Sequence, residues 1–534
     1  MSSGKAFQEM FQGNNERRLV KIFRKLATGV GSISLPRGFS LRSISWREIS
    51  WRSLIGKSLL VVFLLFSLLL IGSSTALMGT LAAVFWVGLA GVVVSYLYAR
   101  FAGYTVFSVG LGLMLVMYFL APLVFKVTGV NLVNKWQFYV MIFAVGGLGS
   151  GMRLLQQSQT FRWSMGALAV FLMLTLISTL FAGRSKYDAG LYQFLSNVKP
   201  VLIILVGFAV AEMKGSEGLV WRVVKTLWLP MLLLMVFQWG APNLYSKVFK
   251  FPGVPPVEYF GIFPSRGMGI FEHPSFASTF GALMSLYCFA VARSDPDRKS
   301  QAVVFAVLYF IIMLGGGGRG ELISYLFAAF CIALVGSKGR SLGQMFMIVL
   351  VVGIVSSVAY FVYKESFAEE ALMWGASASG QIEHPRAQLY DGAIYIANKY
   401  WPLGSGLGTY GGAGSFNFDM SMYYELGFNS FWWFAAGENY IMDIYWHNSI
   451  AEAGWFGFCA LLIHYLLLGF YAAGKFRAES DVRASALWAL AFSGVVFNLL
   501  NSLTSPAFQD PRLFFFPAIC IGLALKCSER GVAK

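Results

Sequence analysis

Apolar runs of about 20 residues recur along most of this chain, and they restrict the folds that it can adopt. Inside a bilayer every backbone polar group needs a partner within the protein, so runs of this length predict membrane-spanning helices. The composition agrees, since 57% of the residues are hydrophobic and only 12% are charged. We therefore expect an all-α polytopic membrane protein with about 14 transmembrane helices (roughly 12–14) and a large, partly helical periplasmic loop.

The expected spans are separated by short connections, and the basic residues fall mostly on one side of the membrane. The spans lie near residues 54–72, 76–98, 104–125, 136–151, 163–182, 198–213, 220–240, 267–292, 301–316, 320–336, 343–362, 447–472, 485–503 and 512–526. An excess of Lys and Arg is typical of cytoplasmic connections. The pattern therefore predicts that the N-terminus and the C-terminus are both cytoplasmic.

The net charge of +16 is not spread evenly over the chain. Residues 1–53 hold ten Lys or Arg and three Glu, which predicts a basic cytoplasmic N-terminal segment lying against anionic lipid. This segment is too long and too basic before the first apolar run to be a cleaved signal peptide. The partners that the charge indicates are therefore membrane lipids and no nucleic acid.

The spans and connections divide the remaining chain into four parts. They are a bundle of spans 1–11 at 54–362, a large periplasmic loop at 363–446, spans 12–14 at 447–526 and a cytoplasmic tail at 527–534. The acidic residues of the large loop outnumber its basic ones, which favours the outward side. Within it we expect short helices near 366–376 and 384–399 and a glycine-rich turn at 404–412. A second outward loop, 241–265, contains five prolines and predicts an extended strap.

Three arginines are expected at the outward face. Arg266 begins a span, Arg319 follows the glycine run 315–318, and Arg386 lies in the large loop. An arginine at a membrane boundary is costly unless it snorkels, pairs or binds a ligand. Converging guanidinium groups with nearby glycines suit a pyrophosphate. The alternatives are interfacial anchors for Arg266 and Arg319 and a solvated surface charge for Arg386.

His447, at the end of the large loop, is the best-placed histidine for acid–base chemistry, and a capping or interfacial histidine is the alternative. His273 and His384 each precede a proline and are weaker candidates, while His464 is expected to make a polar contact inside the bundle. The aromatic residues at 431–446 favour a membrane-interface belt over a sugar-binding platform. The five cysteines have no paired spacing, so neither a disulfide framework nor a metal site is indicated.

The order of these motifs resembles one family. The chain has Arg266-Gly-x-Gly-x-Phe-x-His-Pro, the glycine-flanked Arg319, Arg386 followed by Trp401-Pro-Leu-Gly-x-Gly-Leu-Gly, and His447-Asn448 before Gly454-x-x-Gly457. In this order, with the large loop among them, the motifs resemble the superfamily of O-antigen ligases and O-antigen or exopolysaccharide polymerases. The resemblance covers about residues 260–470.

The resemblance implies a metal-independent, inverting glycosyltransferase of the bacterial inner (plasma) membrane that uses no cofactor. Its donor is an undecaprenyl-pyrophosphate-linked glycan, and its acceptor is a glycan that is lipid-linked or part of lipid A core. His447 is then the general base, and Arg319 and Arg386 hold the donor pyrophosphate. The implied substrate-binding residues are Arg266, Asn448, Glu452, Gly406 and Gly408, with Asn448 orienting His447 and Glu452 lining the same cavity.

Two departures from the family pattern favour a polysaccharide polymerase. The spacer from His447-Asn448 to Gly454 is about one helical turn shorter than in ligases, and glycines replace a serine-bearing segment before Arg319. An O-antigen ligase of lipopolysaccharide biosynthesis, with lipid A core as acceptor, is the alternative within the class. The alternative from another class is a transporter or flippase for lipid-linked oligosaccharides. Transport predicts repeated halves and charges buried along a path, and few buried charges are expected here.

Overall fold

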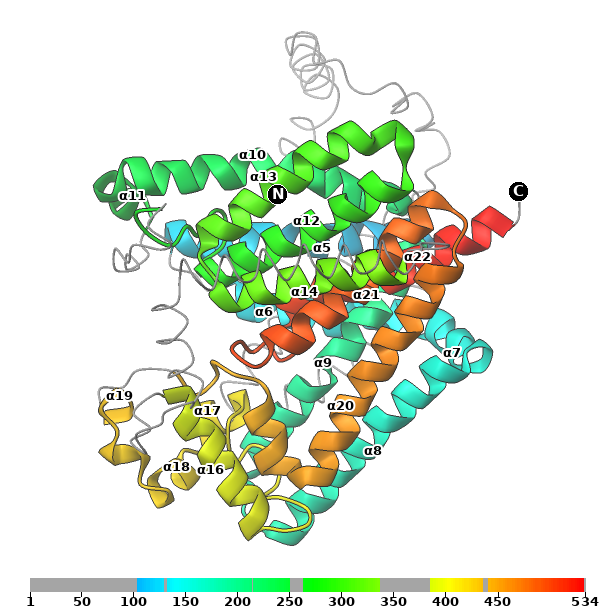
Figure 1. Cartoon of the computed structure of the whole chain (residues 1–534). Helices are drawn as coiled ribbons and strands as arrows, with labels where there is room; N and C mark the ends of the chain where they lie inside the picture. Colours follow the sequence, from blue (N-terminus) through cyan, green and yellow to red (C-terminus); the bar gives the residue numbers. More distant parts are fainter. Residues whose placement is uncertain are drawn as a thin grey trace, which may run out of the picture. The chain divides into compact units, whose positions relative to one another are not determined.

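The structure is a computed structural model that describes residues 103–128, 132–213, 215–249, 263–336, 385–435 and 440–532. Several predictions fall outside these residues: the basic segment 1–53, the spans 54–72, 76–98 and 343–362, the helix 366–376 and His384. Within the described ranges every regular element is a helix (Figure 1).

The long helices of the described residues carry most of the expected spans. They are α5 (Gly103–Thr128), α8 (Gln159–Ala182), α9 (Tyr187–Ala211), α10 (Leu219–Gly240), α12 (Pro274–Ser294), α13 (Lys299–Gly316), α14 (Arg319–Val335), α20 (Trp446–Ala478), α21 (Val482–Asn501) and α22 (Pro511–Val532). In this part of the chain, nine helices are long and apolar enough to cross a membrane. The prediction of an all-α polytopic membrane protein is confirmed at this level.

Shorter helices join the long ones or extend beyond them. They are α6 (Val133–Ala144), η3 (Val145–Gly147), α7 (Leu148–Gln157), η4 (Ser216–Gly218), α11 (Pro242–Val248), η5 (Pro296–Arg298), α16 (Pro385–Lys399), α17 (Ala413–Phe418), α18 (Ser421–Glu425), η6 (Phe428–Ser430) and α19 (Trp432–Ala435). We call residues 385–435 and 440–445 the cap. Figure 1 shows α16 beside the N-terminal end of α20, and these two helices are in direct contact, whereas α17 contacts α9.

Burial separates the long helices into an interior and an exterior set. In α9, α12, α21 and α22, between 67% and 78% of the apolar window is buried. In α5, α8, α10 and α13 the share is only 22–33%, and their exposed side chains are apolar, as in Leu180 and Phe181 of α8. An apolar exterior of this kind fits contact with lipid rather than with water.

The interior helices approach closely where small residues face one another. A Cβ added to Gly522 of α22 would lie only 2.3 Å from the carbonyl carbon of Gly207 in α9. Small residues let helix backbones pack at short distance, which is a main source of helix association in membranes. The α9–α22 pair is therefore closely packed, and α9 also contacts α17 of the cap.

One local prediction about the connections is wrong, and one expected span is helical throughout but interrupted by a 3-10 turn. The extended strap expected at 241–265 is wrong for Pro242–Val248, which form the helix α11 because proline at the first helical position costs no hydrogen bond, and residues 250–262 lie outside the described residues. The single span expected at 136–151 is divided into α6, η3 and α7.

The long helix α20 is broken at Gly454, whose φ of 65° and ψ of −174° are not helical. The break leaves carbonyl groups of the preceding turn without helical donors. The N–H groups of Ser405 and Gly406 donate to the carbonyls of Ala451 and Glu452, at 2.9 and 3.1 Å. The glycine-rich loop of the cap is therefore hydrogen-bonded into the broken helix that begins with Trp446 and His447.

Aromatic side chains form the core of the cap. Trp433 is fully buried and donates its indole N–H to Gln388 at 2.7 Å, while the rings of Tyr410 and Tyr423 stack at 4.7 Å. Trp446 is also buried. The expected interface belt is therefore wrong for these two tryptophans: Trp433 packs in the core of the cap, and Trp446 packs outside the cap against Phe458, Tyr465 and Phe508.

Candidate functional site

His447 is completely buried at the start of α20. Its Nε2 lies 2.9 Å from the carbonyl oxygen of Ile441, so Nε2 carries the proton in the neutral ring and donates it to this carbonyl. Nδ1 has no hydrogen-bond partner in the described part of the chain. The ring is thus held in one orientation with Nδ1 buried and unprotonated, so that this nitrogen can accept a proton as a general base does.

Asn448 and Glu452 hold the glycine-rich loop against α20. Asn448 donates to the carbonyl of Tyr410 at 2.8 Å and accepts from Gln193 of α9 at 3.2 Å. The N–H of Tyr410 donates to the Glu452 carboxylate at 3.2 Å. The hydrogen bonds of Asn448 therefore go to the loop and to α9, and the carbonyl of Ile441 is the group that orients His447.

Gly406 and Gly408, predicted as substrate-binding residues, pack against the bundle. Both have left-handed backbones, with φ of 94° and 73°. A Cβ on Gly408 would lie 2.3 Å from the carbonyl carbon of Ala189, and one on Gly406 would lie 2.9 Å from Cα of Thr179. These positions support the loop, because any side chain there would push it away from α8 and α9.

Replacing Gly408 by alanine is expected to lower the free energy of unfolding by about 1–3 kcal/mol more than replacing Gly427 by alanine. Both glycines have left-handed backbones, but a Cβ at Gly427 would meet nothing within 4 Å. Backbone strain is therefore common to both alanine variants, and only the Gly408 variant adds overpacking. Thermal unfolding of the two purified variants in detergent measures the difference, and equal midpoints would contradict the described contact.

Arg266 joins three segments of the bundle. Its Nε donates to the carbonyl of Gly316 at 3.2 Å and its Nη2 to the hydroxyl of Ser275 at 3.4 Å. The next residue, Gly267, donates its N–H to the carbonyl of Gly315 at 2.7 Å. The segment before α12 is therefore attached to the C-terminal end of α13, where the glycine run begins.

Arg266 and Arg386 converge on two carboxylates, Glu321 and Asp443. Arg386 forms an ion pair with Asp443, with Nη2 3.7 Å from Oδ2, and Arg266 also acts electrostatically on this carboxylate. Both arginines also interact electrostatically with Glu321, which is buried in the first turn of α14 and hydrogen-bonded to Ser275. Two of the three predicted arginines are thus brought together, although they are far apart in the sequence.

Asp443 is crowded by the surrounding protein but partly open to water. Its side chain is 37% exposed and that of Arg386 is 24% exposed. Desolvation by the surrounding protein raises the pKa of the Asp443 carboxyl above its ordinary value, and the positive charges of Arg386 and Arg266 only partly oppose this rise. A ligand with a higher negative charge can therefore compete with Asp443 for the guanidinium group of Arg386.

Arg319 is the first residue of α14, two positions before Glu321, and it is half-buried. The missing side chain of Gly320 leaves room for Thr504, whose hydroxyl oxygen lies 2.6 Å from the position that a Cβ would take, and Oδ1 of Asn501 lies 3.8 Å from the same position. Asn501 is buried, and neither atom of its amide has a hydrogen-bond partner among the described residues. A positive helix end beside an unsatisfied amide is suited to an anionic ligand.

The arginine cluster and His447 share two structural elements. On α16, Tyr390 lies one turn after Arg386, and its ring is 6.4 Å from the His447 ring. In the turn before α20, Ile441 binds His447 and Asp443 binds Arg386. The predicted base and two of the predicted arginines therefore belong to one contiguous site.

Two further histidines have structural roles. His273 caps α12, because its Nδ1 accepts the N–H of Ser275 at 3.2 Å. His464 is buried in α20 and lies 3.0 Å from the Ser164 hydroxyl, which agrees with the expected contact inside the bundle.

Sequence reasoning missed several residues of the site, namely Glu321, Asp443, Ser275, Asn501, Gln193, Tyr390 and Tyr410. Only Glu321 had a local signal, since an acidic residue so close after Arg319 is unusual in an apolar helix. The expectation of few buried charges is also wrong. Lys126, Lys199 and Glu452 are each at most 6% exposed within the bundle.

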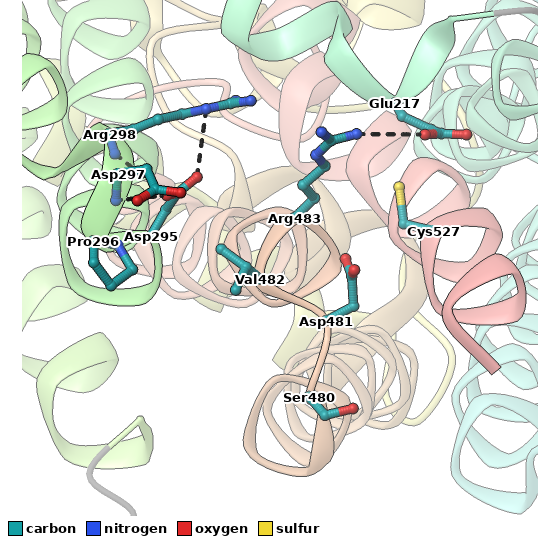
Figure 2. A pocket seen from close by; sticks show the side chains of 10 residues that line it. All are labelled: Glu217, Asp295, Pro296, Asp297, Arg298, Ser480, Asp481, Val482, Arg483 and Cys527. Atoms are coloured by element: carbon teal, nitrogen blue, oxygen red, sulfur yellow. Dashed lines mark hydrogen bonds and ion pairs between the residues drawn. The ribbon is translucent and has the colours of Figure 1, made fainter. Parts of the chain in front are cut away.

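A separate cavity of about 810 Å³ lies at the other end of α20, far from His447 along that helix. Figure 2 shows two ion pairs in it, with Arg483 3.9 Å from Glu217 and Arg298 3.4 Å from Asp295. Asp481 caps α21. These charges satisfy each other, so the cavity contributes nothing to the candidate site.

Comparison with protein-family models finds no match to this chain, and a search of curated proteins finds none either.

Proposed function

We propose that this protein transfers a glycan from a polyprenyl-pyrophosphate donor to an acceptor hydroxyl, and that it polymerises polysaccharide repeat units. The observation that carries the proposal is the convergence of Arg266 and Arg386 beside the turn that binds His447. Anion-binding groups next to an oriented base suit a reaction in which pyrophosphate leaves and a hydroxyl attacks.

In the proposed reaction the donor pyrophosphate binds at Arg386, Arg266 and Arg319. The bond between the anomeric carbon and the pyrophosphate oxygen breaks, and its electron pair leaves with the polyprenyl pyrophosphate. Guanidinium groups stabilise the negative charge that develops on this leaving group. The competing carboxylates Glu321 and Asp443 keep the arginines in place when no donor is bound.

The acceptor hydroxyl attacks the anomeric carbon from the opposite face, which inverts its configuration. Its proton passes to Nδ1 of His447, the nitrogen left basic by the hydrogen bond from Nε2 to Ile441. The new bond joins the acceptor oxygen to the transferred glycan. His447 then releases the proton to water. One polyprenyl pyrophosphate is released for each glycosidic bond formed.

The proposal includes a topology of about 14 spans in a bacterial inner membrane, with the cap on the periplasmic side. A polyprenyl donor would reach the arginines from the bilayer and a glycan from the water. An O-antigen ligase has the same donor and the same chemistry, and it differs in using lipid A core as the acceptor.

The buried charges favour a second candidate function, the transport of lipid-linked oligosaccharides. Lys126 and Lys199 lie inside the apolar bundle, where transporters place the groups that line a path. Transport moves the donor across the membrane without breaking it.

The experiment that tests the proposal incubates the purified protein with lipid-linked oligosaccharide, with and without lipid A core, and separates the products on a gel. A ladder formed from the donor alone supports a polymerase. Products that need lipid A core would replace the polymerase with a ligase. An unchanged donor in both reactions, with folded protein, would contradict transfer altogether.

Transfer is expected to continue at an unchanged rate in the presence of a strong chelator such as EDTA. The arginines can neutralise the leaving pyrophosphate, so no divalent cation is required for that step. The measurement compares initial rates after exhaustive chelation with rates after Mg²⁺ is added back. Loss of activity that Mg²⁺ restores would contradict the assigned role of the arginines.

Binding of inorganic pyrophosphate is expected to respond to the raised pKa of Asp443. As the pH falls through this pKa, the carboxyl takes up a proton, its ion pair with Arg386 is lost and the guanidinium group becomes available. Asp443→Asn should therefore bind more tightly than wild type at about pH 8, and the difference should shrink towards about pH 5. Titration of pyrophosphate and of Glu321 affects wild type and Asp443→Asn alike, so it cancels in the ratio of their dissociation constants. A ratio that stays the same from about pH 8 to about pH 5 would contradict the role of Asp443.

A further inference from the structure

A groove of about 690 Å³ lies on the cap, on a different side of α16 from the candidate reaction site. One wall is formed by Gln388, Asp391, Tyr395 and Lys399 of α16, and the facing wall includes Glu425 and Phe431. Its volume falls within the range of roughly 300–1,000 Å³ that is usual for ligand pockets.

Two faces of α16 line two different sites. Positions 388, 391, 395 and 399 follow the spacing of three or four residues that places side chains on one helix face. Arg386 and Tyr390, one turn apart, lie on the face that contacts Asp443 and His447. One short helix therefore connects the groove to the candidate reaction site.

The chemistry of the groove suits a carbohydrate. Its floor is apolar, with Ile396, Met422 and Phe428 buried, whereas the ring of Tyr395 is exposed at the rim. A sugar ring presents C–H groups on its faces and hydroxyl groups at its edges, so it can lie on aromatic rings and bond to carboxylates around them.

Other ligands fit the groove less well. Glu425 is paired with Arg184, so Asp391 and Lys399 are the remaining charges of the groove, and there is no excess of positive charge to attract a polyphosphate or another strongly anionic ligand. The charged rim disfavours a lipid chain. Asp391 also lies in no ion pair within the described ranges, so its carboxylate can accept hydrogen bonds from hydroxyl groups.

Only one aromatic layer separates the groove from His447. The ring of Tyr410 lies 5.8 Å from the His447 ring on one side and 6.2 Å from the Phe428 ring on the other. Gly392, which lines the groove, touches the same tyrosine, since an added Cβ would lie 2.3 Å from its hydroxyl oxygen. The groove and the reaction site therefore lie on opposite sides of one thin wall of the cap.

We propose that the groove binds the glycan at sugar units remote from the reacting one and retains a growing chain between successive transfers. This inference rests on the proposed function and adds a second glycan-binding surface to it. It requires that affinity rises with oligosaccharide length, and that Tyr395 and Asp391 contribute to this rise.

The first test measures binding to the full-length protein in detergent. The probes are fluorescently labelled oligosaccharides of one or several repeat units, released by mild acid from the polyprenyl-linked pool of the source cells. Tyr395→Ala should weaken binding of the longer probes by about tenfold, and Tyr395→Phe should weaken it much less because the ring remains. Tyr187→Ala removes an equally exposed tyrosine outside the groove and should bind like wild type.

The second test measures the length of the products made by the same variants. Tyr395→Ala should release shorter glycans than Tyr187→Ala, because it holds the growing chain less well. Equal binding of long probes by wild type and Tyr395→Ala would overturn the groove proposal, even if transfer is normal. Binding that depends on Tyr395 in a protein that transfers nothing would support the groove and would contradict the proposed function.

Discussion

Alanine in place of His447 is expected to lower the rate of glycan transfer by about 100-fold or more, which would leave no visible product on a gel. The variant lacks the nitrogen that takes the acceptor proton, while the arginines that bind the donor are unchanged. The measurement is the initial rate per folded protein, together with binding of the lipid-linked donor. Donor affinity should stay within about threefold of wild type, because His447 acts on the acceptor.

The control for this prediction is His464→Ala. His447 and His464 are both buried in α20, and each is hydrogen-bonded to another segment. Loss of either ring leaves a cavity and lowers the thermal midpoint, but only His447 belongs to the candidate site. Similar rates in the two folded variants would remove His447 from the mechanism.

Alanine in place of Arg386 is expected to abolish transfer and to weaken binding of the donor by about 100-fold. The substitution removes a charge-assisted contact to the pyrophosphate and also leaves Asp443 as an unbalanced negative charge beside it. Arg319→Ala is expected to abolish transfer too, since Arg319 opens the helix end that faces the proposed anion. Binding is measured with lipid-linked donor, and the rate is measured with saturating acceptor.

Two further variants make the arginine prediction specific. Arg386→Lys keeps the charge but loses the bidentate geometry, so it should recover part of the binding and less of the rate. Arg483→Ala removes an arginine that pairs with Glu217 in the distant cavity and should transfer at the wild-type rate. Near-normal donor affinity in Arg386→Ala would mean that the pyrophosphate binds elsewhere.

Local sequence signals predicted the elements that depend on neighbouring residues. The helix expected at 384–399 is found as α16, because proline begins it and its apolar positions recur at helical spacing. The glycine run before Arg319 separates α13 from α14, with Gly317 in the left-handed conformation that ends a helix. The polytopic all-α class followed from the length of the apolar runs alone.

The rest of the site depends on contacts between distant segments. The pairing of Arg386 with Asp443 joins α16 to the turn before α20, and no periodicity in either segment predicts it. The same holds for Asn448, whose partners Tyr410 and Gln193 lie in the cap and in α9. Pro242 misled the reading of α11, since a proline at the first helical position looks like a helix breaker in the sequence.

The most direct test of the account counts bonds broken and bonds formed in one reaction. Purified protein in sealed vesicles receives lipid-linked oligosaccharide, and the released polyprenyl pyrophosphate and the new glycosidic bonds are measured together. The account predicts equal amounts of both from wild-type protein, and neither from His447→Ala. Appearance of intact donor on the opposite side of the vesicle membrane, without release of polyprenyl pyrophosphate, would contradict it and establish transport.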